Sequence, residues 1–507
     1  MRGFDETMLA TPADYDVLIV GAGISGIGMA AHLEMMCPDR TYTVIEGRED
    51  IGGTWDLFRY PGIRSDSDMH SLSYHFEPWT GRETLASGER IKDYLRRVTE
   101  KYGVADHIRF GTKVRAAAFD SAIGCWTVEL EDASGTREVR ANWLYLAAGY
   151  YDYDEPYSPA FEGEESFAGP VIHPQQWPEN LDYSDKRVAV IGSGATAVTL
   201  VPNMAMKAAK VFMVQRTPTY VRSIPSQDRL GQFLRMVLPL KLATRIARHL
   251  RVRLTDKMFR TAREKPDEVR ARIERETRKA LGEHYRAEDF SPPYNPWDQR
   301  MCFVPDADLF EAMKNGRAEI VNGHVERFSP QGIVMQDGRT VEVDIIVKAT
   351  GLQLVMGGKI ALSVDGKPVV PQEHYFYKNS MLSGVPNLVH PVPYTNAGST
   401  LRFDLLSDYT CRVLNKMAEL RADIAVPTIP EGVELDTVQS FHLNASYVQR
   451  SGEMLPKSST SDPWRLNHDY LHDRKYMAED PIDDGLLLFR RAGANARASE
   501  EQLEAAE

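Results

Sequence analysis

The stretch Asp16-Val-Leu-Ile-Val-Gly-Ala-Gly-Ile-Ser-Gly26 decides the fold of the first part of this 507-residue chain. Its apolar start predicts a strand over 16–20, and the glycines after it predict a tight turn. A helix over 27–36 and a second strand over 42–45 complete a β-α-β unit. Gly21, Gly23 and Gly26 follow the pattern in which a dinucleotide pyrophosphate approaches backbone N–H groups at a helix N-terminus.

A second turn of this kind, Gly192-Ser-Gly-Ala-Thr-Ala197, follows the apolar run 187–191 and precedes an expected helix to residue 206 and a strand over 211–214. Its predicted cofactor-binding residues are Gly192, Gly194 and Thr196. The predicted fold is therefore α/β, with two Rossmann-like dinucleotide-binding domains.

The residue at the end of the second strand differs between the two copies. In the first copy it is Glu46, whose carboxylate can accept hydrogen bonds from both ribose hydroxyls, which favours FAD. In the second copy Arg216 and Thr217 follow the strand, and an arginine can pair with the 2′-phosphate of NADPH. An ordinary solvated arginine is the alternative for Arg216.

Changes of pattern along the chain predict its domains. We expect an FAD-binding domain made of 1–152 and 349–490, and an NADP-binding domain made of 153–228 and 299–348. A helical insertion is expected over 229–298 and a disordered tail over 491–507. Further short strands are expected at 126–130, 143–148, 320–327 and 333–335, and before the turn Ala349-Thr-Gly351.

Composition limits the partners. The formal net charge of −12 argues against a nucleic-acid binder, which needs a basic surface, and favours small molecules. The four cysteines form no C-x-x-C pair, so neither a redox disulfide nor a metal site is expected. Neither an export signal nor an apolar run long enough to span a membrane is visible, which predicts a cytoplasmic protein. Its oligomeric state, monomer or homo-oligomer, stays open.

The segment 229–281 is strongly basic, with 16 Lys or Arg against 6 Asp or Glu. From Leu240 to Met258 its apolar residues follow helical spacing, with Lys241, Arg245, Arg248 and Arg251 on the other side. Two interpretations fit this pattern: a solvated cap over the substrate entrance, or a helix in weak peripheral contact with an anionic membrane.

The segment between the two turns carries a family resemblance. Phe167-Ala-Gly-Pro-Val-Ile-His-Pro-Gln-Gln-Trp-Pro178 resembles the signature of the flavin-dependent Baeyer–Villiger monooxygenases, and Phe167, Gly169, His173 and Trp177 fill its fixed positions. The resemblance looks closest to the ethionamide-activating subgroup. It implies that the signature connects the nucleotide domains and that His173 anchors a hinge; His173 as a catalytic base is the alternative.

A second motif agrees with the first. Residues 52–66 are similar to the family's Gly-x-Trp, Tyr-Pro-Gly and Asp pattern, which places Thr54, Trp55 and Asp66 at the flavin. Thr350 and Gly351 resemble a second flavin-contacting segment of flavoproteins with two dinucleotide sites.

The resemblance implies an NADPH- and O2-dependent monooxygenase in which O2 adds at the flavin C4a as a peroxide. That peroxide would convert ketones to esters or lactones and would oxidise sulfur in thioethers or thioamides. Arg300 is the expected catalytic cation and Asp66 its partner. Gln299 stands where many relatives have a lysine that contacts the 2′-phosphate, which leaves the strength of the NADPH preference open.

Three other functions fit the sequence less well. A flavin N-hydroxylase of the same fold is disfavoured by Trp177 and the Asp66 motif, and a disulfide reductase by the lack of a proximal cysteine pair. A non-catalytic FAD/NADPH-binding sensor would leave Arg300 and Asp66 without a purpose.

Overall fold

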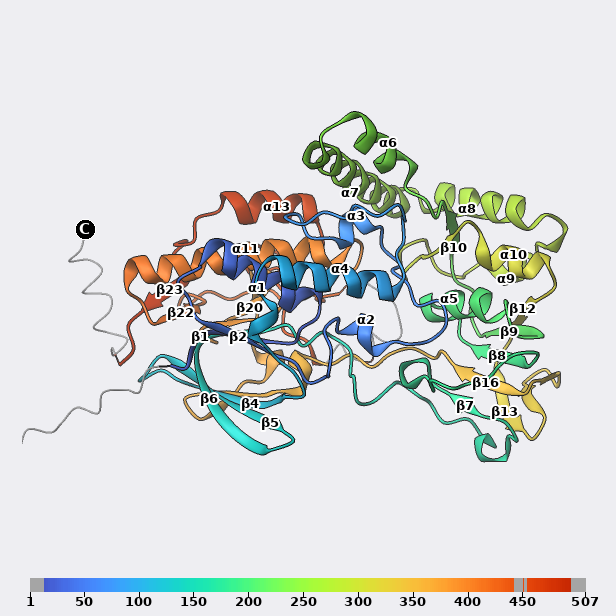
Figure 1. The fold of residues 1–507 in the computed structure, drawn as a ribbon, viewed down its shortest axis with the longest axis horizontal. Coiled ribbons are helices and arrows are strands. Elements are labelled where there is room, and N and C mark those ends of the chain that lie inside the picture. The colour runs from blue at the N-terminus through green and yellow to red at the C-terminus, as the bar shows by residue number, and fades with distance from the viewer. Residues whose placement is uncertain (1–12, 442–449, 451–453, 494–507) are drawn as a thin grey trace, which may run out of the picture.

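The computed structural model describes residues 13–441, 450 and 454–493. Most of the predicted tail over 491–507 lies outside the described residues. Two sheets with their covering helices lie side by side, and the chain passes between them more than once (Figure 1). The predicted α/β class with two dinucleotide-binding folds is confirmed.

The first sheet grows from the predicted β-α-β unit. β1 (Tyr15–Val20) leads through α1 (Ile24–Met36) to β2 (Tyr42–Ile45), and the two strands pair in parallel. The helix begins at Ile24, three residues earlier than predicted, because Gly23 is already its N-cap. The strand order is β18-β17-β4-β5-β6-β1-β2-β3, and β21 also pairs with β6. The other strands are β3 (Ile108–Arg109), β4 (Lys113–Asp120), β5 (Cys125–Asp132), β6 (Gly135–Leu146), β17 (Ala361–Val364), β18 (Lys367–Pro368) and β21 (Leu388–Val389).

Helices from distant parts of the chain cover this sheet: α4 (Gly88–Lys101), α11 (Ser399–Leu420) and α13 (Tyr470–Glu479), together with α1 (Figure 1). Their apolar faces form one core with Val17, Trp143 and Leu414, all of which are buried. Short elements complete this half: α2 (Thr54–Leu57), α3 (Met69–Leu72), β19 (Phe376–Tyr377), β20 (Met381–Leu382), β22 (Ile424–Pro427) and β23 (Leu487–Arg490).

The second sheet is parallel and follows the order β12-β9-β8-β16-β7. Its strands are β7 (Val171–Ile172), β8 (Arg187–Ile191), β9 (Lys210–Gln215), β12 (Ala318–Asn322) and β16 (Ile345–Lys348). The helices α5 (Ala195–Met204), α9 (Ala287–Phe290) and α10 (Asp308–Lys314) lie beside it. The edge strand β7 comes from within the signature segment, so this segment is part of the second sheet.

The basic segment forms α6 (Arg229–Val237), α7 (Leu240–Glu264) and α8 (Pro266–Leu281), which lie along one border of the molecule (Figure 1). These helices lie in the sequence between β10 (Val221–Ile224) and β11 (Cys302–Pro305), and these two strands pair in parallel. Within the described residues, no helix has the length and apolar character needed to cross a membrane.

One strand was predicted incorrectly. Residues 320–327 do not form a single element, because β12 ends at Asn322 and β13 (Val325–Ser329) turns away into a small antiparallel sheet. Gly323 makes the break with φ +140°, a backbone conformation that favours glycine. β14 (Gly332–Met335) and β15 (Thr340–Glu342) complete that sheet.

Candidate active site

The first glycine turn is built so that two of its glycines cannot be replaced. A Cβ on Gly21, whose φ is +102°, would lie 2.5 Å from the Ala147 carbonyl oxygen, and one on Gly26 would lie 1.9 Å from the Gly21 carbonyl oxygen. Gly23 is different, since a Cβ there would meet only ordinary contacts at 3.6 Å. Because Gly23 is the N-cap of α1 and offers no side-chain acceptor, the first N–H groups of this helix are left for a ligand such as a pyrophosphate.

Glu46 is fixed against the same turn. Its carboxylate is buried and accepts hydrogen bonds from the backbone N–H of Ala22 at 2.7 Å and of Arg48 at 2.9 Å. Burial raises the pKa of Glu46, and the two N–H donors oppose that rise. The predicted ribose-binding carboxylate therefore lies where a dinucleotide on this turn would extend.

The motif over residues 52–66 begins beside the first glycine turn and ends in the other half of the molecule. Gly53, with φ +54°, lies so close to the turn that a Cβ would be 3.1 Å from the Gly23 Cα. Thr54 and Trp55 follow at the start of α2. Further on, a Cβ on Gly62 would lie 2.1 Å from the side chain of Asn203 on α5. The motif thus connects the first turn with the helix of the second turn.

This motif ends at Asp66, which the fold brings to Arg300. The Arg300 Nη2 lies 3.2 Å from the Asp66 Oδ2, and each side chain is 37 % exposed. The two residues are far apart in sequence, and the structure joins the loop before α3 to the loop before β11. Arg64, two residues before Asp66, makes a similar connection to Asp308 on α10: its Nη1 lies 2.5 Å from the Asp308 Oδ2.

The second glycine turn repeats the logic of the first. Gly192 has φ +138°, and a Cβ there would lie 2.3 Å from the Ala349 carbonyl oxygen, whereas a Cβ on Gly194 would meet open space. Thr196 lies in the first turn of α5, and the Ser193 hydroxyl donates to the Thr217 carbonyl at 2.8 Å. Arg216 is exposed directly after β9, so its guanidinium is available to a ligand.

The second predicted flavin segment lies between the two halves. The Thr350 hydroxyl donates to the Tyr157 carbonyl at 2.8 Å, and Gly351 takes φ +113°. Tyr153, which the sequence did not single out, lies with its hydroxyl 3.4 Å from that of Thr54, and burial raises its pKa to about 12. Nothing in the spacing of the chain marks this contact.

The signature residues hold the edge of the second sheet. A Cβ on Gly169 would lie 2.1 Å from the Asp344 carbonyl oxygen, so only glycine permits this approach to the start of β16. Phe167 packs in the core on one side of the sheet, and Trp177 packs on the core of the other side. The His173 Nδ1 accepts from the Gln175 backbone N–H at 3.2 Å, and burial lowers the pKa of His173.

A cavity of about 420 Å³ opens beside the Arg300–Asp66 pair. Both residues line it. Apolar side chains form part of its wall: Leu230, Leu254 and Met258 from the basic helices, and Trp297, Met301 and Phe303 from the segment around Arg300. Charged side chains, among them Asp68, Arg222, Arg229 and Arg251, also line it. A fixed cation at the wall of a partly apolar cavity is suited to bind a small, weakly polar molecule and to stabilise negative charge on it.

Comparison with known proteins identifies the family. The family described as "Pyridine nucleotide-disulphide oxidoreductase" matches residues 18–230. The FAD-containing monooxygenase EthA of Mycobacterium tuberculosis (strain CDC 1551 / Oshkosh) is 44% identical over 481 residues, 94% of this chain and 98% of EthA. The chain belongs to the FAD-containing monooxygenases. A probable FAD-binding monooxygenase, AlmA of an Acinetobacter species, is 41% identical over 94% of this chain and 97% of its own length.

The fold of this FAD-containing monooxygenase also matches a solved structure titled "Oxidized steroid monooxygenase bound to NADP". The TM-score is 0.72 at 23% identity, over 94% of this chain and 99% of that one. The family resemblance read from the signature is confirmed, and the names of these proteins agree with the predicted cofactors, FAD and NADP(H).

The cysteines of this monooxygenase are not joined in the described structure, although the matching family description mentions disulphide chemistry. All four lie within the described residues as buried free thiols, and burial raises the pKa of Cys302 to about 12. A thiol with a raised pKa is a poor nucleophile at neutral pH.

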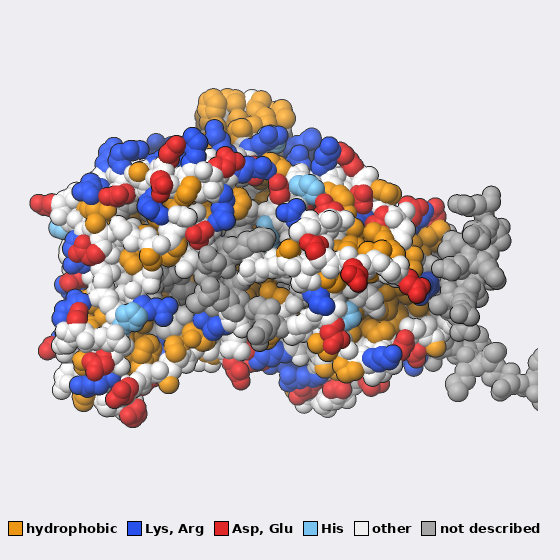
Figure 2. All heavy atoms as spheres, turned by 180° about the vertical axis from the view of Figure 1, so that it is seen from behind, with side chains coloured by type: hydrophobic (Ala, Val, Ile, Leu, Met, Phe, Trp, Pro, Cys, Tyr) orange, Lys and Arg blue, Asp and Glu red, His pale blue; other side chains and the backbone are white. Residues whose placement is uncertain are grey.

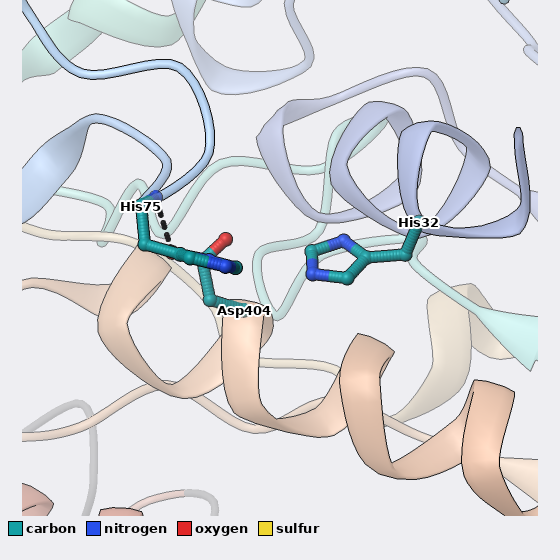
Figure 3. A group of neighbouring side chains, drawn as sticks. All are labelled: His32, His75 and Asp404. Atoms are coloured by element: carbon teal, nitrogen blue, oxygen red, sulfur yellow. Dashed lines mark hydrogen bonds and ion pairs between the residues drawn. The ribbon is translucent and has the colours of Figure 1, made fainter. Parts of the chain in front are cut away.

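One group of side chains in the described part of the monooxygenase has the composition of a metal site. The ligand atoms of His32, His75 and Asp404 lie within 4.8 Å of one another, and both imidazoles turn toward the carboxylate (Figure 3). However, the Asp404 Oδ2 already accepts from Arg248 at 3.1 Å and from the His75 backbone N–H at 2.8 Å. A divalent cation at this position would be repelled by the nearby positive charge of the Arg248 guanidinium. We therefore infer that Asp404 binds Arg248 and that the cluster is not a metal site.

Proposed function

We propose that this protein is an NADPH- and O2-dependent Baeyer–Villiger monooxygenase that converts ketones to esters or lactones and oxidises sulfur in thioethers or thioamides. FAD binds at the turn around Gly21 with Glu46, and NADP(H) binds at the turn around Gly192 with Arg216. The observation that carries the proposal is the Arg300–Asp66 pair at 3.2 Å, facing a partly apolar cavity.

Each residue of the pair has a distinct task in this proposal. When bound, reduced FAD supplies the activation of O2 at its C4a atom. Arg300 stays protonated at any working pH and stabilises the negative charge that develops beside it. Asp66 orients the guanidinium through its ion pair, and the apolar side chains of the cavity wall bind the hydrocarbon part of the substrate.

The signature segment acts as the hinge between the two domains in this proposal. The chain segments 150–152 and 353–355, which connect the two halves, pair in an antiparallel way. The Asp152 N–H donates to the Gln353 carbonyl at 2.9 Å, and the Val355 N–H donates to the Tyr150 carbonyl at 3.1 Å. The Gln175 side chain ties the signature to them by donating to the Asp152 carbonyl at 2.7 Å. Gln175→Met removes this link and keeps the side-chain length. Unchanged rates of flavin reduction by NADPH in that variant would contradict the hinge.

The deciding experiment is anaerobic reduction of the purified holoenzyme by NADPH, followed by oxygen and a panel of ketones, thioethers and one primary amine. Ester or sulfoxide formed in step with NADPH consumption supports the proposal. Hydroxylamine as the sole product would favour an N-hydroxylase. Hydrogen peroxide as the sole product would show that the protein acts only as an NADPH oxidase. Absence of any flavin reduction would leave the non-catalytic sensor. A cytoplasmic location remains a prediction.

A further inference from the structure

The hairpin of α6 and α7 exposes an unusual amount of apolar surface. Of the fifteen large apolar side chains that the described residues expose, eight lie between positions 230 and 254. They are Leu230, Phe233, Met236, Val237, Leu240, Leu242, Leu250 and Leu254, with exposed fractions from 44 % to 83 %. Figure 2 shows a hydrophobic group projecting from the upper border of the molecule, with Lys and Arg side chains beneath it. A monomer that is surrounded by water rarely keeps such a patch.

Two arginines of α7 point inward, and several of its leucines are exposed. Its inner face buries the small residues Ala243 and Ala247 and directs Arg248 and Arg251 inward. Arg251 binds Asp228 at 2.9 Å and Arg248 binds Asp404 at 3.1 Å, and both carboxylates are buried. Ion pairs with buried carboxylates hold these two arginines on the inner face of the helix. Leu240, Leu250 and Leu254 are exposed to solvent.

The charge around the patch has one sign. Between residues 229 and 255 the sequence holds seven Lys or Arg and no Asp or Glu, in a chain whose net charge is −12. Arg229, Lys241, Arg245 and Arg253 among these cations are exposed. A two-fold contact between copies of this hairpin would bring the same cations face to face, which disfavours a dimer. A surface of negative headgroups over hydrocarbon complements both the cations and the apolar tip.

The patch is continuous with the cavity of the candidate active site. Leu230 and Leu254 line that cavity and are also 44 % and 54 % exposed, so they stand at its mouth. Phe233, Met236 and Val237 do not line it, and they form the outer part of the patch. An apolar molecule leaving a bilayer in contact with the patch would meet the cavity wall without crossing bulk water.

From these observations we infer that the α6–α7 hairpin binds the surface of an anionic phospholipid bilayer with its apolar tip inserted, and that the enzyme takes its substrate from the bilayer. The substrate class is then a long-chain ketone or thioether that partitions into membranes. The inference of membrane binding depends only on the exposed patch, whereas the inference about the substrate also rests on the proposed function.

Binding is tested by sedimentation of the full-length holoenzyme with vesicles of phosphatidylcholine alone or with about one third phosphatidylglycerol. We expect binding to the anionic vesicles only, weakened at about 500 mM salt compared with about 20 mM. The triple variant F233S/M236S/V237S should bind at least tenfold more weakly. The control triple variant M206S/V370S/V433S, whose side chains are exposed elsewhere, should bind like wild type.

Substrate delivery is tested with butanone in water and tridecan-2-one held in the same vesicles. The tip variant should keep wild-type turnover of butanone and lose at least fivefold in turnover of the vesicle-held ketone. Failure of the wild type to bind anionic vesicles overturns the inference. A dimer that the tip variant abolishes, without vesicle binding, would assign the patch to a second copy and also overturn it. Vesicle binding without turnover of any ketone would refute the proposed function and leave the membrane surface standing.

Discussion

Arg300 and Asp66 lie 3.2 Å apart between Nη2 and Oδ2, although 234 positions separate them in the sequence. Asp66 is the last residue of the motif over 52–66. This motif packs against the first glycine turn at Gly53 and against α5, the helix of the second glycine turn, at Gly62. Arg300 lies in the loop that follows the helices of the basic segment and precedes β11. The pair therefore stands where the two nucleotide-binding halves and the helical segment meet, and it lines the cavity.

Replacement of Arg300 by alanine tests its catalytic assignment. NADPH should still reduce the flavin, because the cofactor turns are untouched, whereas oxygenation should fall by about 10²–10³-fold, as for loss of one group that stabilises developing charge. Stopped-flow reduction and product analysis measure the two steps separately. Arg300→Lys keeps the charge and serves as the matched control. Ester formation at the wild-type rate in Arg300→Ala would remove Arg300 from the chemistry.

Asp66→Asn removes the negative partner and keeps the shape of the side chain. If Asp66 orients Arg300, oxygenation should fall on the order of tenfold, less than for loss of the cation itself. A larger share of NADPH should then be lost as hydrogen peroxide, because a misdirected guanidinium stabilises the reacting charge less well. The ratio of ester to NADPH consumed is the measurement. An unchanged ratio would mean that Asp66 has no part in directing Arg300.

The elements that could be predicted from the sequence are those whose cause is local. The turns at Gly21 and Gly192 carry their own glycines, and the strands before them are short apolar runs, so both β-α-β units lie where the pattern placed them. The pairing of Arg300 with Asp66 could not come from spacing, since it depends on how two distant loops pack. Its prediction came from the family resemblance.

The orientation of α7 shows the opposite case. Helical spacing assigned its leucines and its arginines to different faces, but the structure divides both sets. Arg248 and Arg251 point inward, while Lys241 and Arg245 are exposed together with Leu240, Leu250 and Leu254. The inward direction of Arg248 and Arg251 is set by Asp228 and Asp404, buried carboxylates from other parts of the chain that need cationic partners. The break at Gly323 was missed for a similar reason, because an apolar run gives no sign that its two ends belong to different sheets.

Gly194 and Gly192 offer a matched pair for the second nucleotide site. Gly194 has an ordinary backbone conformation, and a Cβ there meets open space, so Gly194→Ala should fold like wild type. The added methyl group would occupy the space that a pyrophosphate needs, and the Kd for NADPH should rise about tenfold or more. Gly192→Ala should instead unfold or fail to express, because its Cβ would meet the Ala349 carbonyl. Fluorescence titration and thermal denaturation measure the two effects, and unchanged NADPH affinity in Gly194→Ala would place the pyrophosphate elsewhere.

Arg216→Ala tests the recognition of the 2′-phosphate. The guanidinium is exposed, so its removal should leave stability within about 0.5 kcal/mol of wild type. The ratio of kcat/KM for NADPH to that for NADH should fall by about 10- to 100-fold, since a charge-assisted pair with the phosphate is lost while NADH has no such phosphate. Exposed Arg275 on α8, outside the nucleotide turns and the cavity, provides the control variant Arg275→Ala. An unchanged ratio would assign the phosphate to another cation.

The buried Asp228 ties the basic helices to α3, and its titration gives a pH-dependent prediction. Burial opposes its ionisation, but hydrogen bonds from His70 at 2.7 Å and Arg251 at 2.9 Å outweigh burial and hold the pKa of Asp228 well below its usual range. A carboxyl whose pKa is depressed on folding stabilises the fold above its unfolded pKa of about 3.9, and this contribution is lost as the pH falls further.

Asp228→Asn should therefore lower the stability of the protein by about 3 kcal/mol at pH 7, because it leaves Arg251 without its anion in a partly buried position. The difference from wild type should stay constant down to about pH 5 and shrink below about pH 4, as the Asp228 carboxyl of the unfolded wild-type chain becomes protonated while the folded one stays ionised. Asp267→Asn, which removes an exposed partner of Arg270 in the same segment, should change stability by less than about 0.5 kcal/mol at either pH. Thermal denaturation across this range is the measurement. A deficit of Asp228→Asn that persists unchanged at pH 3 would show that the residue stabilises the hairpin by packing and not by its charge.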